Sequence, residues 1–447
     1  MTGGASLSYA EALRAIGERG RFGVRLGLAR TRAMLRELGD PHRGLRGVLV
    51  GGTNGKGSVL ALAGSALRTA GYRVGETPKP HLVTYRERLQ VDGRPVDPTT
   101  FARLVSEVLL VADRVAPRHG PPTEFEILTA VVFLWFGEQA IDVALVEVGL
   151  GGRLDATHAW DGGVAAITNI DLDHMDRLGP TIPAIAREKA AIIERGDLAV
   201  TGATGEGLAV IRRRARRLGV PLAVVEPAPL VTWDRDGIVV RLPGLGEARV
   251  GLRGRHQAAN VAVADASLDA LGQAGIARVD DDARRLGYVR ATWPGRLELV
   301  ETGGREVLLD GAHNPAGAAA LAVALDDLRP YLAPGRVTLL TATMADKDVE
   351  GLVAALAGAR ALAGARVVTT AVDLPRALAA DDLGARWAAL APGVDPRPIV
   401  EPSVGDALDR ALAQADGPVV VAGSLYLVGE VRSRLVDDPL LRDPSDG

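Results

Sequence analysis

The chain has no cysteine among its 447 residues, which excludes a disulfide framework and thiolate chemistry and fits the reducing cytoplasm. It also has no large excess of charge of one sign, because its formal net charge is −3. Its one short basic run, residues 212–217, is typical of a solvated helix face. We therefore expect neither a disulfide-rich secreted domain nor a nucleic-acid-binding protein.

Long hydrophobic runs are missing as well. The longest, residues 127–136, spans about ten residues, whereas a membrane-spanning helix needs about 20. Residues 1–10 lack the charged-then-apolar pattern of a signal peptide. Hydrophobic residues make up 47% and charged residues 24%, as in soluble globular proteins, and the length predicts two or three domains. We expect a soluble cytoplasmic protein without a membrane partner.

What the sequence does contain is a group of glycines around one lysine. Residues 47–50 are predicted to form a buried strand, and Gly-Gly-Thr-Asn-Gly-Lys-Gly-Ser follows at residues 51–58. Glycine N–H groups can approach phosphate oxygens closely, Lys56 adds a positive charge, and the Ser58 hydroxyl can reach Mg²⁺. A helix that begins at once also favours anions at its N-terminus.

The match to the general phosphate-loop pattern G-x-x-x-x-G-K-[ST] is imperfect. Val50 stands where the first glycine belongs, and Gly57 separates Lys56 from Ser58. From these residues alone, an ordinary glycine-rich strand-to-helix turn stays an alternative to a nucleotide site.

Strands and helices are expected to alternate along the whole chain. The predicted strands are 87–91, 141–148, 164–168, small antiparallel strands within 231–250, and 306–309, 336–340, 365–370 and 418–421; a helix is predicted over 182–194. The near-continuous apolar runs favour parallel strands buried on both faces. We predict an α/β fold with a mostly parallel P-loop-type domain over residues 1–293 and a smaller Rossmann-like domain over 294–447.

Charged side chains follow two of the buried strands. Glu147 closes the strand at 141–148, where a carboxylate could bind Mg²⁺, although a plain strand-end charge is the alternative. Asp171, Asp173 and His174 follow the next strand, where a metal site and a structural role are both open. Lys189, on the face of a predicted helix, is expected to be a solvated charge.

Two further candidates come from the C-terminal half. His313 is predicted at a strand-to-helix turn, where α/β sheets bind ligands. Arg296 follows Pro-Gly at the predicted domain junction, from which an arginine could reach a phosphate. The residues by themselves therefore indicate an ATP-using, Mg²⁺-dependent enzyme of two domains.

Taken together, these segments resemble the bacterial folylpolyglutamate synthase/dihydrofolate synthase family, within the Mur ligase superfamily. The matching blocks occur in the family's order and cover nearly the whole chain. They are Gly-Thr-Asn-Gly-Lys-Gly-Ser at 52–58, Pro-His-Leu at 80–82 with Glu-Arg at 87–88, Thr-Glu-Phe-Glu at 123–126, Glu-Val-Gly-Leu-Gly-Gly-Arg-Leu-Asp-Ala-Thr at 147–157, Ile-Thr-Asn-Ile-Asp-Leu-Asp-His at 167–174, Arg-Glu-Lys-Ala at 187–190, Gly-Arg-His-Gln-Ala-Ala-Asn at 254–260, Pro-Gly-Arg at 294–296, Asp-Gly-Ala-His-Asn at 310–314 and Gly-Ser-Leu-Tyr-Leu-Val-Gly-Glu at 423–430.

The resemblance implies an ATP-dependent amide ligase of folate biosynthesis. The carboxylate of dihydropteroate, or of a folate's glutamate, would attack the γ-phosphate to give an acyl phosphate and ADP. The amino group of L-glutamate would then attack that acyl phosphate. A carboxylate is a poor electrophile until it is phosphorylated. The acceptor carboxylate and the ATP phosphates are both anions, so bringing them together requires the positive charge of metal ions and arginine.

The resemblance also implies ligands and site residues. The ligands are ATP, two Mg²⁺ ions and the small-molecule substrates, with a need for K⁺ left open, and the enzyme would be a monomer. The implied nucleotide site is Thr53, Asn54, Gly55, Lys56, Gly57, Ser58, Asn260, Arg296 and Asp310, to which His313 is added from its position. The implied folate site is Leu26, Gly27, Leu28, Thr123, Glu124, Phe125, Glu126, Leu154, Asp155 and Ala156. The implied Mg²⁺ ligands are Ser58, Glu147, His174 and Lys189; the implied catalytic group is Lys56, Lys189, His174 and Arg296.

For Lys189, the resemblance reverses the expectation of a solvated charge. The matching lysine of the family is carbamylated by CO₂, which turns a cation into an anion that can bind a second metal ion.

One position departs from the family's pattern. Where the family commonly has Thr-Ser-Pro-His, this chain has Pro-Lys-Pro-His at 78–81. The missing serine is a Mg²⁺ ligand in the family, and Lys79 cannot act as a ligand while it is protonated. Either Ser58 or water completes the metal's shell, which we favour, or Lys79 replaces part of the metal's charge at the phosphates.

Three other functions stay open at this point. A cell-wall Mur ligase would join an amino acid to a UDP-sugar peptide, although the blocks at 123–126 and 423–430 speak against it. A P-loop phosphotransferase would use ATP without making an amide, and a non-catalytic nucleotide-binding protein would not use it at all. The sequence does not distinguish dihydrofolate synthesis from polyglutamate extension.

Overall fold

The computed structural model describes residues 7–20 and 26–444, and the chain forms two compact units. Unit 1 comprises residues 1–227, 259–288 and 439–447, and unit 2 comprises residues 228–258 and 289–438. Both units are thus assembled from segments that are discontinuous in sequence. The single boundary expected near residue 293 stays a prediction about domains.

Unit 1 is built on a sheet of eight strands in the order β4-β3-β2-β5-β1-β6-β7-β8. Six of them, from β2 to β8 in that order, run parallel, and β3 and β4 form an antiparallel edge. The strands are β1 (Gly47–Gly51), β2 (Val74–Thr77), β3 (Gln90–Val91), β4 (Arg94–Pro95), β5 (Val143–Glu147), β6 (Gly163–Ile167), β7 (Leu198–Thr201) and β8 (Leu222–Val224). This confirms the mostly parallel α/β sheet expected from the apolar runs.

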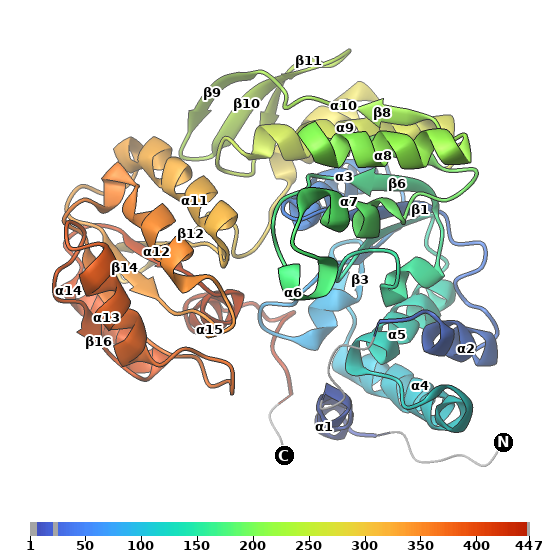
Figure 1. Ribbon diagram of the computed structural model, residues 1–447, viewed down its shortest axis with the longest axis horizontal. Helices are drawn as coiled ribbons and strands as arrows, with labels where there is room; N and C mark the ends of the chain where they lie inside the picture. The colour runs from blue at the N-terminus through green and yellow to red at the C-terminus, as the bar shows by residue number, and fades with distance from the viewer. Residues whose placement is uncertain (1–6, 21–25, 445–447) are drawn as a thin grey trace. The chain divides into compact units, whose positions relative to one another are not determined.

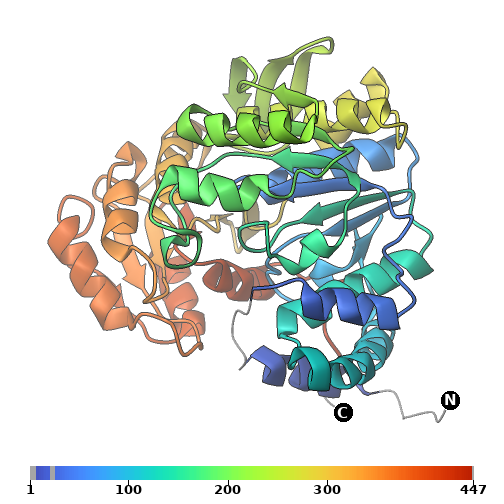
Figure 2. The ribbon, with the colours of Figure 1, turned by 45° about the vertical axis from the view of Figure 1, so that its right-hand side comes forward.

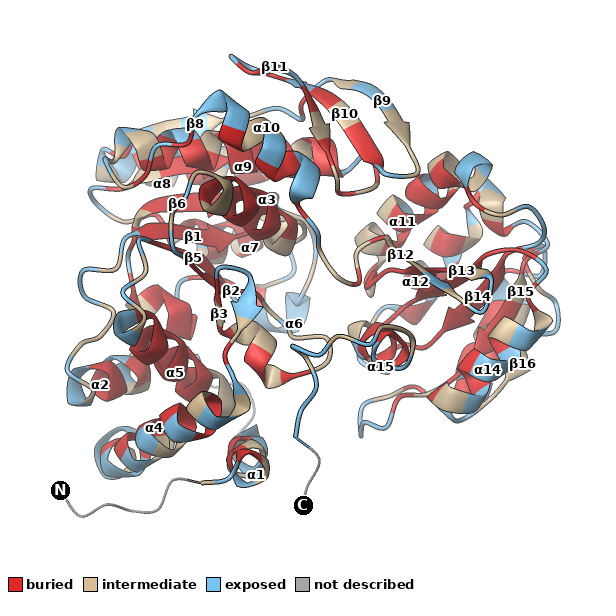
Figure 3. Cartoon of the chain, turned by 180° about the vertical axis from the view of Figure 1, so that it is seen from behind, coloured by how far each residue is buried: buried red, intermediate tan, exposed pale blue. Residues whose placement is uncertain are grey.

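Helices cover both faces of this sheet. On one face, α1 (Tyr9–Gly20), α2 (Ala29–Glu37), α4 (Pro98–His119) and α5 (Glu124–Glu138) share a core with strand residues such as Leu49 and Val146. The helices α7 (Ile182–Ala190) and α8 (Gly205–Leu218) adjoin the same core. Behind the strands lie α3 (Lys56–Thr69), α9 (Gln257–Gln273) and α10 (Asp281–Arg290), as the front view of Figure 1 and the rear view of Figure 3 show. Because β1 and β5 are buried along their whole length, both of their faces are apolar.

Unit 2 contains a three-stranded antiparallel sheet and a six-stranded, mostly parallel one. The first has β9 (Leu230–Asp234), β10 (Gly237–Leu242) and β11 (Gly246–Val250). The second has the order β12-β13-β17-β14-β15-β16, with β12 (Glu298–Thr302), β13 (Arg305–Leu309), β14 (Thr338–Thr341), β15 (Arg366–Thr369), β16 (Ile399–Val400) and β17 (Val419–Ala422). Its helices are α11 (Pro315–Leu328), α12 (Val349–Ala357), α13 (Ala380–Leu390), α14 (Val404–Gln414) and α15 (Leu425–Leu435), which Figure 2 shows around the strands in orange and red.

Two predicted elements differ from the structure. Residues 87 and 88, expected in a strand, belong to the 3-10 helix η1 (Tyr85–Arg88), because Thr84 and Glu87 form a reciprocal capping box at its start. The helix expected to reach residue 194 ends at Ala190. The remaining short helices are η2 (Ala156–Ala159), α6 (Met175–Leu178), η3 (Arg329–Tyr331) and η4 (Arg360–Leu362). None of the described helices combines the length and apolarity that crossing a membrane would need.

Candidate active site

The glycine-rich loop between β1 and α3 has a backbone that only glycine can supply. Gly55 precedes the first turn of α3 with φ 82°, in the left-handed region. A Cβ added to Gly55 would lie 2.1 Å from Oδ1 of Asn260, so the buried Asn260 side chain occupies that space. The structure therefore brings the predicted nucleotide residue Asn260, from α9, against the phosphate loop.

Residues after β6 brace the loop from the neighbouring strand. The N–H of Asn54 donates to Oδ1 of Asn169 at 2.9 Å, and the N–H of Thr53 donates to the main-chain oxygen of Asn169 at 3.0 Å. The hydroxyl of Thr168 donates to the Asn54 oxygen at 2.6 Å. The sequence showed this segment only as part of a family block, and the bracing roles of Thr168 and Asn169 were missed.

Lys56 and Lys189 lie together at the loop although they are 133 positions apart in the chain. The Lys56 ammonium donates to the oxygens of Gly52 (3.2 Å) and Thr53 (3.1 Å), and the Lys189 ammonium donates to the same Gly52 oxygen at 2.8 Å. Lys189 is buried, contrary to the solvated charge first expected from its helix. Burial, together with the nearby positive charge of Lys56, lowers the pKa of Lys189 to about 7.

Glu147 lies at the carboxyl end of β5, beside this loop. Its Oε1 is 3.9 Å from the Lys56 ammonium, and its Oε2 accepts a hydrogen bond from the N–H of Lys79 at 2.9 Å. The buried Ser58 lies in the first turn of α3. His174, in the left-handed region with φ 50°, is 42% exposed and has its Nε2 3.8 Å from Asp173.

These donors fit a magnesium ion that is bound jointly with phosphates. Within the described parts of the chain, no group of three or more His, Asp and Glu side chains forms a ready metal cluster. Mg²⁺ is commonly held by one or two carboxylates, substrate phosphates and water, so one buried carboxylate and one hydroxyl suffice. The ligand roles of Ser58, Glu147, His174 and Lys189 stay predictions.

The three predicted folate segments converge near the carboxyl end of β5, which Glu147 closes. The N–H of Gly27 donates to the Leu154 oxygen at 3.3 Å, which joins segments 26–28 and 154–156. A Cβ on Gly149 would lie 2.6 Å from the Phe125 ring and 3.0 Å from the Asp155 carboxylate, so segment 123–126 lies there too. Leu26 is 41% exposed, which leaves an apolar side chain open at this place.

Three acidic side chains of these segments have partners within unit 1. Both oxygens of Glu126 accept from Nε of Arg30, at 2.9 and 2.8 Å, and Glu126 also completes the capping box of α5 with Thr123. Asp155 caps η2, and Glu124 accepts from the Tyr85 hydroxyl at 2.9 Å. Their carboxylates shape the walls of the region; direct folate contacts stay predictions.

In unit 2, the predicted residues gather at the end of β13. Asp310 accepts from the N–H groups of Leu297 (3.0 Å) and Ala312 (2.9 Å), which fixes the turn. A Cβ on Gly311 would lie 1.9 Å from an Nη of Arg296, so the guanidinium lies across that glycine. Nδ1 of His313 is 2.8 Å from the Gly311 oxygen. Arg296, Asp310 and His313 are thus brought together.

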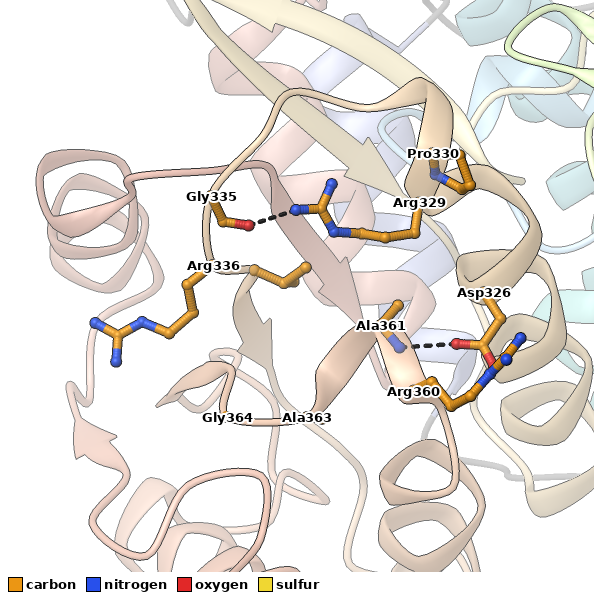
Figure 4. A pocket seen from close by; sticks show the side chains of 10 residues that line it. Asp326, Arg329, Pro330, Gly335, Arg336, Arg360, Ala361, Ala363 and Gly364 are labelled. Atoms are coloured by element: carbon orange, nitrogen blue, oxygen red, sulfur yellow. Dashed lines mark hydrogen bonds and ion pairs between the residues drawn. The ribbon is translucent and has the colours of Figure 1, made fainter.

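A cavity of about 660 Å³ in unit 2 lies elsewhere (Figure 4). Its walls come from segments 326–337 and 360–364, at the amino ends of β14 and β15. Asp310 and His313 follow the carboxyl end of β13, which belongs to the same parallel set through β17. The cavity therefore lies at the opposite end of the parallel strands, and none of the residues that line it is a predicted site residue.

The chain matches two family models: the Mur ligase middle domain over residues 50–268 and the Mur ligase, glutamate ligase domain over residues 295–425. It is similar to the dihydrofolate synthase/folylpolyglutamate synthase of Bacillus subtilis, with 34% identity over 96% of this chain and 99% of that protein.

Two solved structures show the same likeness. A Mycobacterium tuberculosis folylpolyglutamate synthase complexed with ADP and AMPPCP has a TM-score of 0.84 and 32% identity, over 97% of this chain and 100% of that one. Escherichia coli FolC in complex with DHPP and ADP has a TM-score of 0.81 and 28% identity, over 97% and 99%. The phosphate loop, the two Mur ligase matches and these relatives together show that the chain belongs to the folylpolyglutamate synthase/dihydrofolate synthase family of the Mur ligase superfamily.

Proposed function

We propose that this protein joins L-glutamate to dihydropteroate, to the terminal glutamate of a (tetrahydro)folate, or to both, with ATP as the energy source. The chain is an ATP-dependent ligase of the folate family. The observation that supports this most is the layout of unit 1, where Glu147 lies beside the phosphate loop and the three predicted folate segments meet next to the strand that it closes. Structures of relatives in complex with ADP and AMPPCP, and with DHPP and ADP, support a nucleotide and a pterin-class acceptor as the substrates.

The reaction needs a carboxylate and a triphosphate to approach each other. The acceptor carboxylate attacks the γ-phosphorus, the bond to the β-phosphate oxygen breaks, and ADP leaves. The glutamate amine then attacks the acyl carbon, loses a proton, and inorganic phosphate departs. Because every partner before the first step is an anion, positive charge at the meeting point lowers its barrier.

On the nucleotide side, residues 53–58 would bind the phosphates and Asn260 the adenine. The Lys56 ammonium would exchange its bonds to the Gly52 and Thr53 oxygens for phosphate oxygens. For Arg296, Asp310 and His313, which unit 2 gathers at one turn, the roles in nucleotide binding stay predictions.

Mg²⁺ would be held by Ser58, Glu147 and His174, and it would neutralise phosphate charge during transfer. A second ion requires an anion at Lys189. Carbamylation there would bond the amine nitrogen to the carbon of CO₂ with loss of a proton, and the low pKa of Lys189 supports it because the neutral amine is the reactive form.

The test is ADP release by the purified chain with L-glutamate, comparing dihydropteroate with tetrahydrofolate as acceptor. The proposal expects ADP release that requires both an acceptor and glutamate, with a glutamylated product of matching mass. If neither dihydropteroate nor tetrahydrofolate supports turnover, the proposal is contradicted. ATP hydrolysis that needs no acceptor would favour the phosphotransferase alternative. A cytoplasmic location and a monomeric state remain predictions, and light scattering of the purified protein tests the second.

A further inference from the structure

Lys79 stands where the resemblance led us to expect a serine, and its side chain lies beside Glu147 and Phe125. It follows β2 and stands between Pro78 and Pro80, which restrict the backbone around it. Its N–H donates to the Glu147 carboxylate at 2.9 Å. This hydrogen bond holds the backbone of Lys79 against Glu147, which lies beside the phosphate loop and near the predicted folate segments.

The ammonium of Lys79 points toward the folate segments. It donates to the main-chain oxygen of Glu147 at 2.6 Å and lies 5.5 Å from the centre of the Phe125 ring. Burial lowers the pKa of Lys79 to about 8, and the negative charges of Asp155 and Glu147 oppose that shift and favour the ammonium. Phe125 and Asp155 both belong to predicted folate segments, so the cation faces the place where an acceptor would enter.

This ammonium has donors to spare. It carries three N–H groups, and within residues 7–20 and 26–444 it donates to one acceptor, the Glu147 oxygen. The carboxylate of Asp155 is already occupied by the N–H groups of Leu150 (2.8 Å) and Thr157 (3.0 Å). A partly buried cation with unused donors is stabilised when an anion completes its shell.

We propose that Lys79 binds the carboxylate of the folate-class acceptor, the group that becomes the acyl phosphate. Lys79 is then a specificity residue of this chain, acting where its relatives' pattern has a serine. The inference rests on the proposed function, because it assigns one contact within that site. It also replaces the hypothesis that Lys79 substitutes for metal charge at the phosphates, since the ammonium lies near the Phe125 ring. The hypothesis that Ser58 or water completes the metal's shell is unaffected.

The test separates acceptor binding from catalysis. Calorimetry with ADP and EDTA present compares dihydropteroate with its neutral carboxamide, for the wild type and for Lys79→Met. The wild type should prefer the acid roughly tenfold, the size of one charge-assisted hydrogen bond. Lys79→Met should lose that preference while it still binds the carboxamide with unchanged affinity, which also shows that the variant is folded. Lys79→Arg, which keeps the charge, should retain part of the preference.

Each other outcome has a definite meaning. If Lys79→Met keeps the wild-type preference for the acid, Lys79 does not contact the acceptor carboxylate and the inference is wrong. If Lys79→Met instead weakens AMPPCP binding and leaves the acid preference intact, the ammonium serves the phosphates. If the wild type binds neither dihydropteroate nor tetrahydrofolate, nor the carboxamide of either, the proposed function fails and this inference fails with it.

Discussion

The ammonium groups of Lys56 and Lys189 share one acceptor, the main-chain oxygen of Gly52. Two cations this close repel each other. The Glu147 carboxylate, 3.9 Å from Lys56, and the negative charges of Asp173 and Asp155 near Lys189 offset part of this repulsion. The arrangement becomes favourable if one ammonium turns into an anion, and Lys189, buried and with a pKa lowered to about 7, is the one suited to that change.

Lys189→Ala should therefore lose activity by about 100-fold or more, as when a ligand is removed from a metal site. Acetate or propionate should restore part of the activity by supplying the missing carboxylate, and removal of CO₂ should lower the activity of the wild type. The matched control is Glu188→Ala on the same helix, which removes an exposed ion pair with Arg153 and should change neither activity nor the response to acetate. Wild-type turnover by Lys189→Ala would remove the carbamate hypothesis.

Gly55→Ala should weaken AMPPCP binding at least about tenfold, because the loop amides are displaced from the phosphates. The added Cβ would collide with Asn260 as well as occupy the left-handed region. Gly71→Ala is the matched control: its φ is 88°, but no atom lies within 4 Å of the added carbon. It should cost about 1 kcal/mol of stability and leave nucleotide affinity unchanged. Equal nucleotide affinity in the two variants would contradict the close-approach argument.

Glu126→Ala should destabilise the protein by about 3 kcal/mol, because it removes the buried carboxylate that pairs with Arg30 and that completes the capping box with Thr123. It should also raise the KM for the acceptor more than that for ATP, since Arg30 and Glu126 connect two of the folate segments. Glu138→Ala on the same helix removes the exposed pair with Arg103 and should cost about 0.5 kcal/mol. Urea denaturation and steady-state kinetics measure both effects, and similar losses of stability in the two variants would refute the structural role of Glu126.

Loss of the proton from the Glu76 carboxyl group should lower the protein's free energy of unfolding as the pH rises. Burial raises the pKa of Glu76 to about 7 in spite of its pairing with Arg68. The folded state therefore binds the proton more tightly than the unfolded state. The stabilisation from this proton is complete below the ordinary pKa of 4.5 and is lost as the pH rises through about 7.

Between about pH 5 and about pH 8, Glu76→Gln should gain up to about 3 kcal/mol of stability relative to the wild type. Glu107→Gln, at a half-exposed site on α4, should show no such trend. The measurement is urea unfolding of all three proteins across this range. A wild-type curve parallel to that of Glu76→Gln would show that Glu76 is not protonated in the folded state.

Much of the fold followed from local patterns in the sequence. The apolar runs at 141–148 and 164–168 form β5 and β6, because strands buried on both faces need apolar side chains throughout. The small strands within 231–250 form β9, β10 and β11, and the second series of strands forms most of the sheet of unit 2. The glycine-rich segment lies between β1 and α3, since its glycines have backbone angles unfavourable to other residues.

The sequence alone determined the strands, the phosphate loop and the order of the family blocks, because periodicity, glycine and residue order are properties of the chain itself. Only the tertiary structure decided which distant groups meet. Lys189 reaches Gly52 across 137 positions, Asn260 lies against Gly55, and Gly27 bonds to Leu154. Helical periodicity could not show that Lys189 is buried. The identity of residue 79 as lysine could not show which way its ammonium points. Burial and orientation depend on the groups that other elements pack against a side chain.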